Sequence, residues 1–254
     1  MIELLSLGTF SLPKIADRNN EDALLVPVKK ASGYLFAIAD GVGSYDGAGL
    51  ASKAAIDTLN SLNPEVWDDD DSSPFIFQEI KRQISSLSVI DAHYSKAATT
   101  LTFCHVGKGR LRIGHIGDCR AYYRDGGRLK QITEDHTQHQ RLLDEGLYKP
   151  SELKTLGGKN HLYSAISRSI DLVFQAYTIP LSKLCGEDRT IDIVIMSDGA
   201  YAAWDHRPRF SLGTMVDPNR FTSGLLRRIT RLTPSDDHSI IAVKLEDRLE
   251  NIGN

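Results

Sequence analysis

Acidic residues flank strand-like apolar runs at several distant places in this 254-residue chain. The run 36–39 leads into Asp40-Gly41, and the run 191–196 leads through Ser197 into Asp198-Gly199. Three further acidic groups are placed in the same way: Asp118 after the run 111–117, Asp236-Asp237 before the run 239–245, and Glu21-Asp22 before the run 23–28. Carboxylates at the ends of neighbouring buried strands can converge, and converged carboxylates repel one another unless cations lie between them. The pattern therefore predicts a site for hard metal ions.

The segment that follows Asp40 is rich in glycine, with four glycines in residues 41–49. Such a segment lets the backbone approach a ligand closely, and a carbonyl such as that of Gly41 can act as a further oxygen ligand. An isolated Asp-Gly pair would more simply be a turn or a helix cap. A phosphate-binding loop is excluded because no Gly-Lys-Ser/Thr follows, and the glycine spacing does not match the dinucleotide-binding fingerprint.

The elements that must position these acids form an α+β pattern rather than regular βαβ alternation. Apolar runs predict strands near 2–9, 23–29, 34–39, 97–106, 110–116, 120–124, 128–132, 161–166, 172–179, 190–196 and 238–245. Helices are expected over 47–61, 74–93, 137–146, 150–156, 199–204 and 217–231. Asp125-Gly126-Gly127 predicts a hairpin between two of the strands.

The composition is that of an ordinary soluble protein, with 41% hydrophobic and 25% charged residues. We expect one domain covering residues 1–254. A net charge of −3 gives no reason to expect nucleic acid or an anionic membrane as a partner. No apolar run approaches the roughly 20 residues that span a bilayer. The N-terminus lacks the pattern of a secretory signal, and three widely separated cysteines indicate a reducing compartment, most simply the cytoplasm.

The motifs in their order along the chain resemble the metal-dependent protein phosphatase 2C family. The resemblance covers nearly the whole chain, and an ordered series of short motifs is far more specific than any one of them. The motifs are 20–23 (Asn-Glu-Asp-Ala), 40–43 (Asp-Gly-Val-Gly), 97–100 (Ala-Ala-Thr-Thr), 117–122 (Gly-Asp-Cys-Arg-Ala-Tyr), 133–137 (Thr-Glu-Asp-His-Thr), 164–169 (Ser-Ala-Ile-Ser-Arg-Ser), 197–199 (Ser-Asp-Gly) and 236–239 (Asp-Asp-His-Ser).

The resemblance implies a four-layer α-β-β-α sandwich, in which two antiparallel sheets are flanked by helices and a site for two Mg²⁺ or Mn²⁺ ions lies at one end. It also implies a role for each matching position: Asp40 bridges both ions, Glu21 and the Gly41 carbonyl complete one, Asp198 and Asp236 complete the other, Asp22 orients water, and Asp118 holds a third, weaker ion. Oxygen donors without clustered Cys or His suit Mg²⁺ or Mn²⁺ rather than zinc.

The implied reaction is hydrolysis of phosphoserine and phosphothreonine in proteins by a hydroxide that bridges the two ions. No Ser or Cys nucleophile is needed, so Ser197 is expected to be a packing or hydrogen-bonding residue. His136 is expected to be structural, and His238 to lie in an exposed turn.

The chain departs from the family pattern at the phosphate-binding arginine. The family usually places this arginine four residues before the Glu, where this chain has Asp17. Arg18 could serve if the loop is shortened, and the alternative is a surface arginine without that role.

Two other functions stay open at this point: a phosphatase-like binding module that has lost catalysis, and a hydrolase of small phosphoesters. Retention of Glu21, Asp40, Asp198 and Asp236 favours the enzyme. If the chain is a protein phosphatase, we expect it to be a monomer that removes phosphates added by a Ser/Thr kinase.

Overall fold

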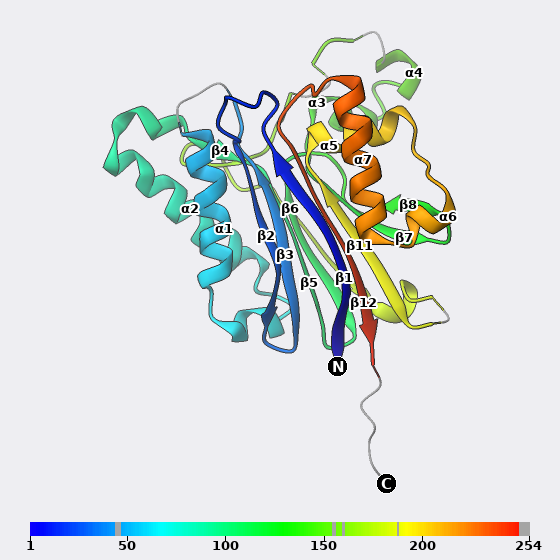
Figure 1. Cartoon of the computed structure of the whole chain (residues 1–254). Helices are drawn as coiled ribbons and strands as arrows, with labels where there is room; N and C mark the ends of the chain where they lie inside the picture. Colours follow the sequence, from blue (N-terminus) through cyan, green and yellow to red (C-terminus); the bar gives the residue numbers. More distant parts are fainter. Residues whose placement is uncertain (44–46, 154–155, 159–160, 187, 249–254) are drawn as a thin grey trace.

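The computed structural model describes residues 1–43, 47–153, 156–158, 161–186 and 188–248, and its central feature is a pair of antiparallel sheets (Figure 1). The first sheet has the strand order β1 (Ile2–Leu12), β12 (His238–Asp247), β11 (Thr190–Met196), β7 (Arg120–Asp125) and β8 (Arg128–Gln131). The second has the order β10 (Gln175–Pro180), β6 (Arg110–Ile116), β5 (Leu101–Gly107), β3 (Gly33–Asp40) and β2 (Asp22–Lys30).

Helices cover the outer face of each sheet, as Figure 1 shows. The helices α1 (Ala48–Ser61) and α2 (Ser73–Ile90) pack against the second sheet, and α5 (Asp198–His206) and α7 (Pro218–Leu232) pack against the first. Shorter elements complete the described chain: α3 (Gln138–Asp144), α4 (Pro150–Leu153), α6 (Leu212–Met215), the two-stranded pair β4 (Ala98–Thr99) and β9 (Ile166–Ser167), and the 3₁₀ turns Pro64–Asp68, Ala92–Lys96 and Leu181–Lys183. The predicted four-layer α+β sandwich is confirmed.

Three apolar layers separate the four layers of secondary structure. Strand β3 shows why, because its side chains alternate between two of these layers. Phe36 and Ile38 pack between the sheets, whereas Ala37 and Ala39 pack toward α1 and α2. A strand that is buried on both faces reads as a continuous apolar run, and this is the run that precedes Asp40 in the sequence.

The predicted hairpin is confirmed, since β7 and β8 pair across a turn in which Gly126 has φ 57°. The predicted strand 161–166 is mostly wrong: only Ile166–Ser167 is a strand, and Leu162 forms a single bridge with Thr137. The backbone of this segment bonds to the start of α3 instead of a sheet, because His161 O accepts from Gln138 N. Residues 154–155 of the predicted helix 150–156, and 159–160, lie outside the described residues.

No helix in the described part of the chain combines the length and the apolar character that crossing a lipid bilayer requires.

Candidate metal centre

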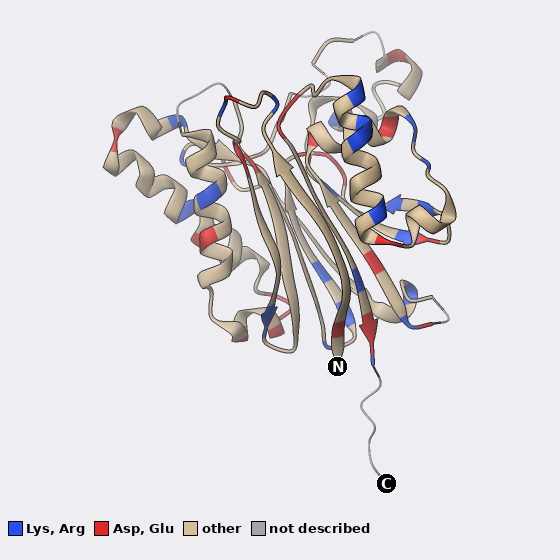
Figure 2. Cartoon of the chain, in the orientation of Figure 1, with Lys and Arg blue, Asp and Glu red and all other residues tan. Residues whose placement is uncertain are grey.

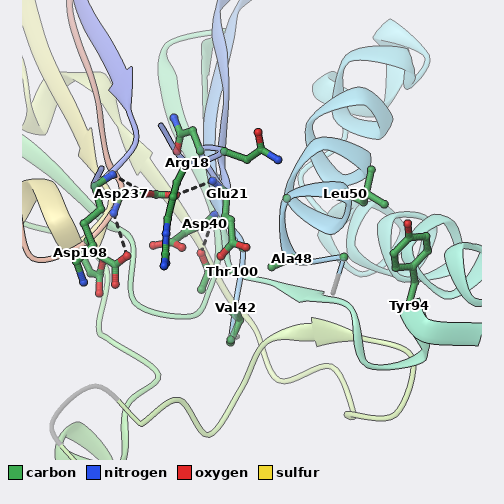
Figure 3. Close-up of a pocket in the computed structure, with 18 of the residues that line it drawn as sticks. Arg18, Glu21, Asp40, Val42, Ala48, Leu50, Tyr94, Thr100, Asp198 and Asp237 are labelled. Carbon is green, nitrogen blue, oxygen red and sulfur yellow. Dashed lines mark hydrogen bonds between the residues drawn. The ribbon is translucent and has the colours of Figure 1, made fainter. Parts of the chain in front are cut away.

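A cleft of about 1380 Å³ opens where strands of both sheets end (Figure 3). The cleft gathers residues that are far apart in the sequence, and Figure 2 shows acidic residues at this end of the sandwich. Seven of the predicted site residues line it: Arg18, Glu21, Asp40, Gly41, Asp118, Asp198 and Asp236. The eighth, Asp22, lies opposite Asp40 in the β2–β3 pair and is buried, with 8% of its surface exposed.

Asp40 is held by Thr100, the residue between β4 and β5, where the sequence pattern predicted one continuous strand. Thr100 N donates to Asp40 O at 2.8 Å, and Asp40 N donates to Thr100 Oγ1 at 3.2 Å. Thr100 lies opposite Asp40 in the register of β3 and β5, but its hydroxyl, rather than its carbonyl oxygen, accepts from Asp40 N. These two bonds fix the backbone of the last residue of β3 at the edge of the cleft.

Gly41 has no room for a side chain. A Cβ atom there would lie 2.7 Å from the carbonyl carbon of Ala48 and 2.9 Å from Glu21 O. Gly41 N also donates to Glu21 O at 3.1 Å. The glycine therefore lets β3, the start of α1 and the Glu21 segment meet at one point, directly after Asp40.

Asp198 is the first residue of α5, which begins directly after β11. The next residue, Gly199, lies against the turn that precedes β12: a Cβ atom there would be 2.1 Å from Asp237 O. This close approach brings Asp198 near Asp236, whose negative charge contributes to raising the pKa of Asp198.

Asp237 fastens the segment between β1 and β2 to the start of β12. Its Oδ1 accepts from Lys14 N at 2.7 Å, and its Oδ2 accepts from Glu21 N at 2.6 Å. The sequence pattern groups Asp237 with Asp236 but predicts no role for it. The signal that could have found it is the pair of adjacent acids, of which only one was needed as a ligand.

Ser197 links the two sheets behind the cleft. Its hydroxyl donates to Asp22 Oδ2 at 2.9 Å and accepts from Ser239 N at 2.9 Å. The expected hydrogen-bonding role of Ser197 is therefore confirmed. The second oxygen of Asp22, Oδ1, is buried without a hydrogen-bond partner among the described residues.

Asp118 is buried in the turn between β6 and β7, where Gly117 has φ 105°. Two residues later, Arg120 forms a bidentate pair with Asp135 and an ion pair of 2.8 Å with Asp205 on α5. Its guanidinium carbon lies 3.7 Å from the centre of the Tyr201 ring, also on α5. These contacts fix the Asp118 turn relative to the helix that carries Asp198.

Simultaneous ionisation of the carboxyl groups at the cleft is unfavourable in the metal-free protein. Desolvation, with neighbouring negative charge as a further cause, raises the pKa of Asp198 to about 6 and the pKa values of Asp22 and Asp118 to about 7. The same causes raise the pKa of Asp40 well above its ordinary value and also raise that of Glu21. A nearby cation would remove this penalty, which is what a metal site requires.

The donor set fits a hard divalent cation. It consists of carboxylate oxygens and a backbone carbonyl, and beside it the buried Asp22 Oδ1 has no hydrogen-bond partner in the described part of the chain. Among the described residues, no three Asp, Glu, His or Cys side chains form a group that could enclose an ion by themselves. Mg²⁺ characteristically keeps several water ligands and binds through one or two carboxylates, so a distributed set of donors suits it. The assignment of each ligand stays a prediction.

Arg18 is exposed and lies at the cleft beside Glu21 and Asp40 (Figure 3). Its positive charge lowers the pKa of Glu21, against the larger effects of burial and of Asp237 and Asp236. The structure thus places a positively charged side chain at the cleft. The position at which the family usually has its arginine is occupied here by Asp17.

The two histidine predictions have different outcomes. His136 is structural as expected: it is buried, accepts from Gly117 N at 3.2 Å and packs 5.0 Å from the ring of His115. The exposed turn predicted for His238 is wrong. His238 is 3% exposed and begins β12, where it pairs with Leu12 and packs edge-on against Phe10, because the sheet continues one residue further than the apolar run.

The architecture and the cleft define a class of protein: an α-β-β-α sandwich with an acidic site across the ends of its two sheets. A family model for protein phosphatase 2C matches residues 15–249, and the chain therefore belongs to the protein phosphatase 2C family.

Two curated relatives are serine/threonine phosphatases of bacteria. PstP of Mycobacterium tuberculosis is 33% identical over 141 residues, which are 53% of this chain and 26% of PstP. The match thus spans about a quarter of the length of PstP. Stp of Listeria welshimeri is 24% identical over 187 residues, or 71% of this chain and 72% of Stp.

Solved structures share the fold along nearly the whole chain. Stp1 of Staphylococcus aureus superimposes with a TM-score of 0.79 at 20% identity, over 96% of both chains. The catalytic domain of PstP in complex with two manganese ions gives a TM-score of 0.70 at 23% identity, over 97% of this chain and 100% of that one.

Proposed function

We propose that this chain is a serine/threonine protein phosphatase that depends on Mn²⁺ or Mg²⁺ and hydrolyses phosphoserine and phosphothreonine in proteins. One observation carries the proposal: carboxyl groups from both sheets meet in one cleft and raise one another's pKa values. Membership of the phosphatase family and the two manganese ions of the PstP structure support it.

The proposed ligands divide between two ions. Asp40 would serve both; Glu21 and the Gly41 carbonyl would complete one, Asp198 and Asp236 would complete the other, and Asp118 would hold a third, weaker ion. When bound, the ions supply Lewis acidity, which lowers the pKa of water so that hydroxide is available near neutral pH and offsets charge on the phosphoryl oxygens.

Asp22 orients the attacking water in this proposal. Ser197 fixes one of its carboxylate oxygens, and the other, Oδ1, has no hydrogen-bond partner among the described residues and can accept a hydrogen bond from water. In the metal-free protein, burial raises the pKa of Asp22 to about 7, and cations in the cleft would lower it again, so that the ionised carboxylate could accept from water.

Arg18 binds the phosphoryl oxygens of the substrate, since a guanidinium group donates paired hydrogen bonds to phosphate. No covalent phosphoenzyme is proposed. Cys119 fits this view, because it is fully buried and burial raises the pKa of its thiol well above the ordinary value.

Hydrolysis of p-nitrophenyl phosphate, with and without Mn²⁺, tests the proposal. We expect hydrolysis that requires the metal and that Asp198→Asn abolishes, with Asp57→Asn, an exposed acid on α1, as the control. Failure of the wild-type protein to hydrolyse this ester or a phosphothreonine peptide would favour the binding module. The presence of Asp17 in place of the usual arginine supports that alternative. Faster hydrolysis of small metabolites than of phosphothreonine peptides would favour the small-phosphoester hydrolase.

A further inference from the structure

A second hollow, of about 710 Å³, lies beside the candidate metal centre and has the opposite charge. It is formed by the end of α5, the segment that follows it, and the second half of α7. Five arginines line it: Arg207, Arg209, Arg227, Arg228 and Arg231. Figure 2 shows the basic residues of α7 and of the segment after α5 on this flank of the sandwich.

The hollow is positively charged along its described lining. No acidic residue is among the described residues that line it. Asp205, at the end of α5, is ion-paired with Arg120 on the other side, and Asp217, at the start of α7, is paired with Arg220. Arg227 and Arg231 lie four residues apart on α7, and like charges at this spacing are destabilising, so an anion in the hollow would relieve that repulsion.

The hollow has a rigid wall. Arg228 donates to the carbonyl oxygens of Arg207 at 2.5 Å and of Arg209 at 3.1 Å, and its guanidinium carbon lies 4.2 Å from the centre of the Phe210 ring. Phe210 in turn packs against α7 at Gly224, where a Cβ atom would be 3.3 Å from the ring. Arg228 and Phe210 therefore fix the shape, while Arg207, Arg209, Arg227 and Arg231 remain exposed to solvent.

Two short connections join this hollow to the metal centre. Asp198 of the cleft and His206 of the hollow are the two ends of α5, about 12 Å apart at 1.5 Å per residue. Leu232 of the hollow and Asp236 of the cleft are four residues apart, at most about 14 Å. An extended peptide of four to five residues would cover about the same span.

We propose that the hollow binds a second phosphoryl group of the protein substrate, on a residue several positions away from the one that is hydrolysed. Arginine forks match the geometry of phosphate, and their charge-assisted hydrogen bonds are stronger than neutral ones. The net charge of −3 and the small size of the hollow favour a phosphopeptide over nucleic acid or a membrane. This inference rests on the proposed function, since it names the kind of substrate that the cleft would receive.

A binding measurement tests the hollow without catalysis. The probe is a fluorescent peptide with one phosphothreonine, and the protein is metal-free, so that the acidic cleft repels the phosphate. We expect binding that requires the phosphate and that falls at least about tenfold in Arg227→Gln/Arg231→Gln. Arg220→Gln, on the first turn of the same helix and outside the hollow, is the matched control and should bind as the wild type does.

A kinetic measurement with Mn²⁺-loaded protein tests the substrate. One peptide carries two phosphothreonines separated by four residues, and the other carries only one. We expect KM for the doubly phosphorylated peptide to be about tenfold lower, and this advantage to vanish in Arg227→Gln/Arg231→Gln but not in Arg220→Gln. Hydrolysis of p-nitrophenyl phosphate should be equal in all three proteins, because it does not reach the hollow.

The two measurements separate this proposal from the proposed function. Equal binding of phosphorylated and unphosphorylated peptide, an equal loss in Arg220→Gln, or tighter binding of duplex DNA or anionic vesicles than of the phosphopeptide would overturn the docking role. If the phosphopeptide binds through Arg227 and Arg231 but no ester is hydrolysed, the proposed catalysis fails and the anion site stands.

Discussion

The carboxylate of Asp237 accepts a hydrogen bond from the backbone N–H of Glu21 at 2.6 Å, which joins the start of β12 to the residue before β2. The two residues are 216 positions apart in the chain. Since the other oxygen of Asp237 holds Lys14 N, the whole segment between these contacts, Arg18 included, is anchored at both ends.

Replacing Asp237 with Ala should therefore weaken the site without removing a proposed ligand. Loss of two hydrogen bonds to a charged acceptor releases the Glu21 segment, and we expect Mn²⁺ affinity and kcat/KM to fall about tenfold. Asp237→Asn, which keeps one carbonyl acceptor, should lose less. Calorimetric titration with Mn²⁺ measures the effect, and unchanged affinity in Asp237→Ala would contradict it.

Asp40→Asn should remove nearly all activity, at least about a hundredfold, because this single carboxylate is proposed to serve both ions. The same change should raise the melting temperature of the metal-free protein at pH 8, because it removes a buried carboxyl group whose ionisation is unfavourable in the folded state. Burial and the charges of Asp22, Asp198 and Asp118 raise the pKa of this group. Asp57→Asn on α1 is the control for both. A loss of activity together with a lower metal-free melting temperature would indicate damage to the fold instead.

The metal-free protein should become less stable as pH rises from about 4 to about 7, through its site carboxyl groups. Asp22, Asp118 and Asp198 have pKa values raised to about 6 or 7, so in this window the folded state binds more protons than the unfolded state and is favoured by acid. Buried His115 and His136, with pKa values lowered to about 3 and about 4, have the opposite effect below about pH 6.5.

The two contributions can be separated by thermal unfolding of the wild type and of Asp198→Asn across this pH range. The difference in melting temperature between them should grow with pH, in favour of the variant, and saturating Mn²⁺ should reverse it at pH 7.5. A difference that does not vary with pH would contradict the raised pKa of Asp198.

Ser197→Ala should lower the stability of the fold and shift the pH profile of kcat. It leaves Ser239 N and Asp22 Oδ2 buried without their shared partner, which costs about 1–3 kcal/mol in the free energy of unfolding. It also removes a hydrogen bond that lowers the pKa of Asp22, so the acid limb of the kcat profile should move to higher pH. Ser197→Thr, which keeps the hydroxyl, should restore that limb even if it is less stable.

Asp118→Ala should leave the binding of two ions largely intact and weaken only the effect of a third. Calorimetric titration with Mn²⁺ measures the binding of the two principal ions. Activity measured at high and at low Mn²⁺ shows the effect of the third ion. Loss of all Mn²⁺ binding in this variant would show that Asp118 belongs to the principal pair of sites.

Much of this site could be predicted from the sequence because its residues lie directly next to strands. Asp40, Asp118 and Asp198 each follow an apolar run, and the end of a buried strand fixes where the next residue lies. The continuous apolar runs of β3 and β11 thus located both the core and the acids.

The contacts that hold the acids in place could not be predicted in the same way. The bonds of Asp237 to Lys14 and Glu21 join segments that lie next to each other only after β1 and β12 have paired. Thr100 lies inside an apolar run, and nothing in that run shows that its hydroxyl would accept from Asp40 N. The burial of His238 could not be predicted for a similar reason, since it depends on pairing with Leu12 rather than on the neighbours of His238 in the chain.

The Ser197 hydroxyl, which links Asp22 at the edge of one sheet to Ser239 in the other, crosses the seam between the two halves of the sandwich. Asp40 comes from one half, and Asp198 and Asp236 come from the other. Ions shared among them would clasp the halves together, and a chelator should loosen that seam before it melts either half. Occupancy of the site and closure of the sandwich would then be a single equilibrium.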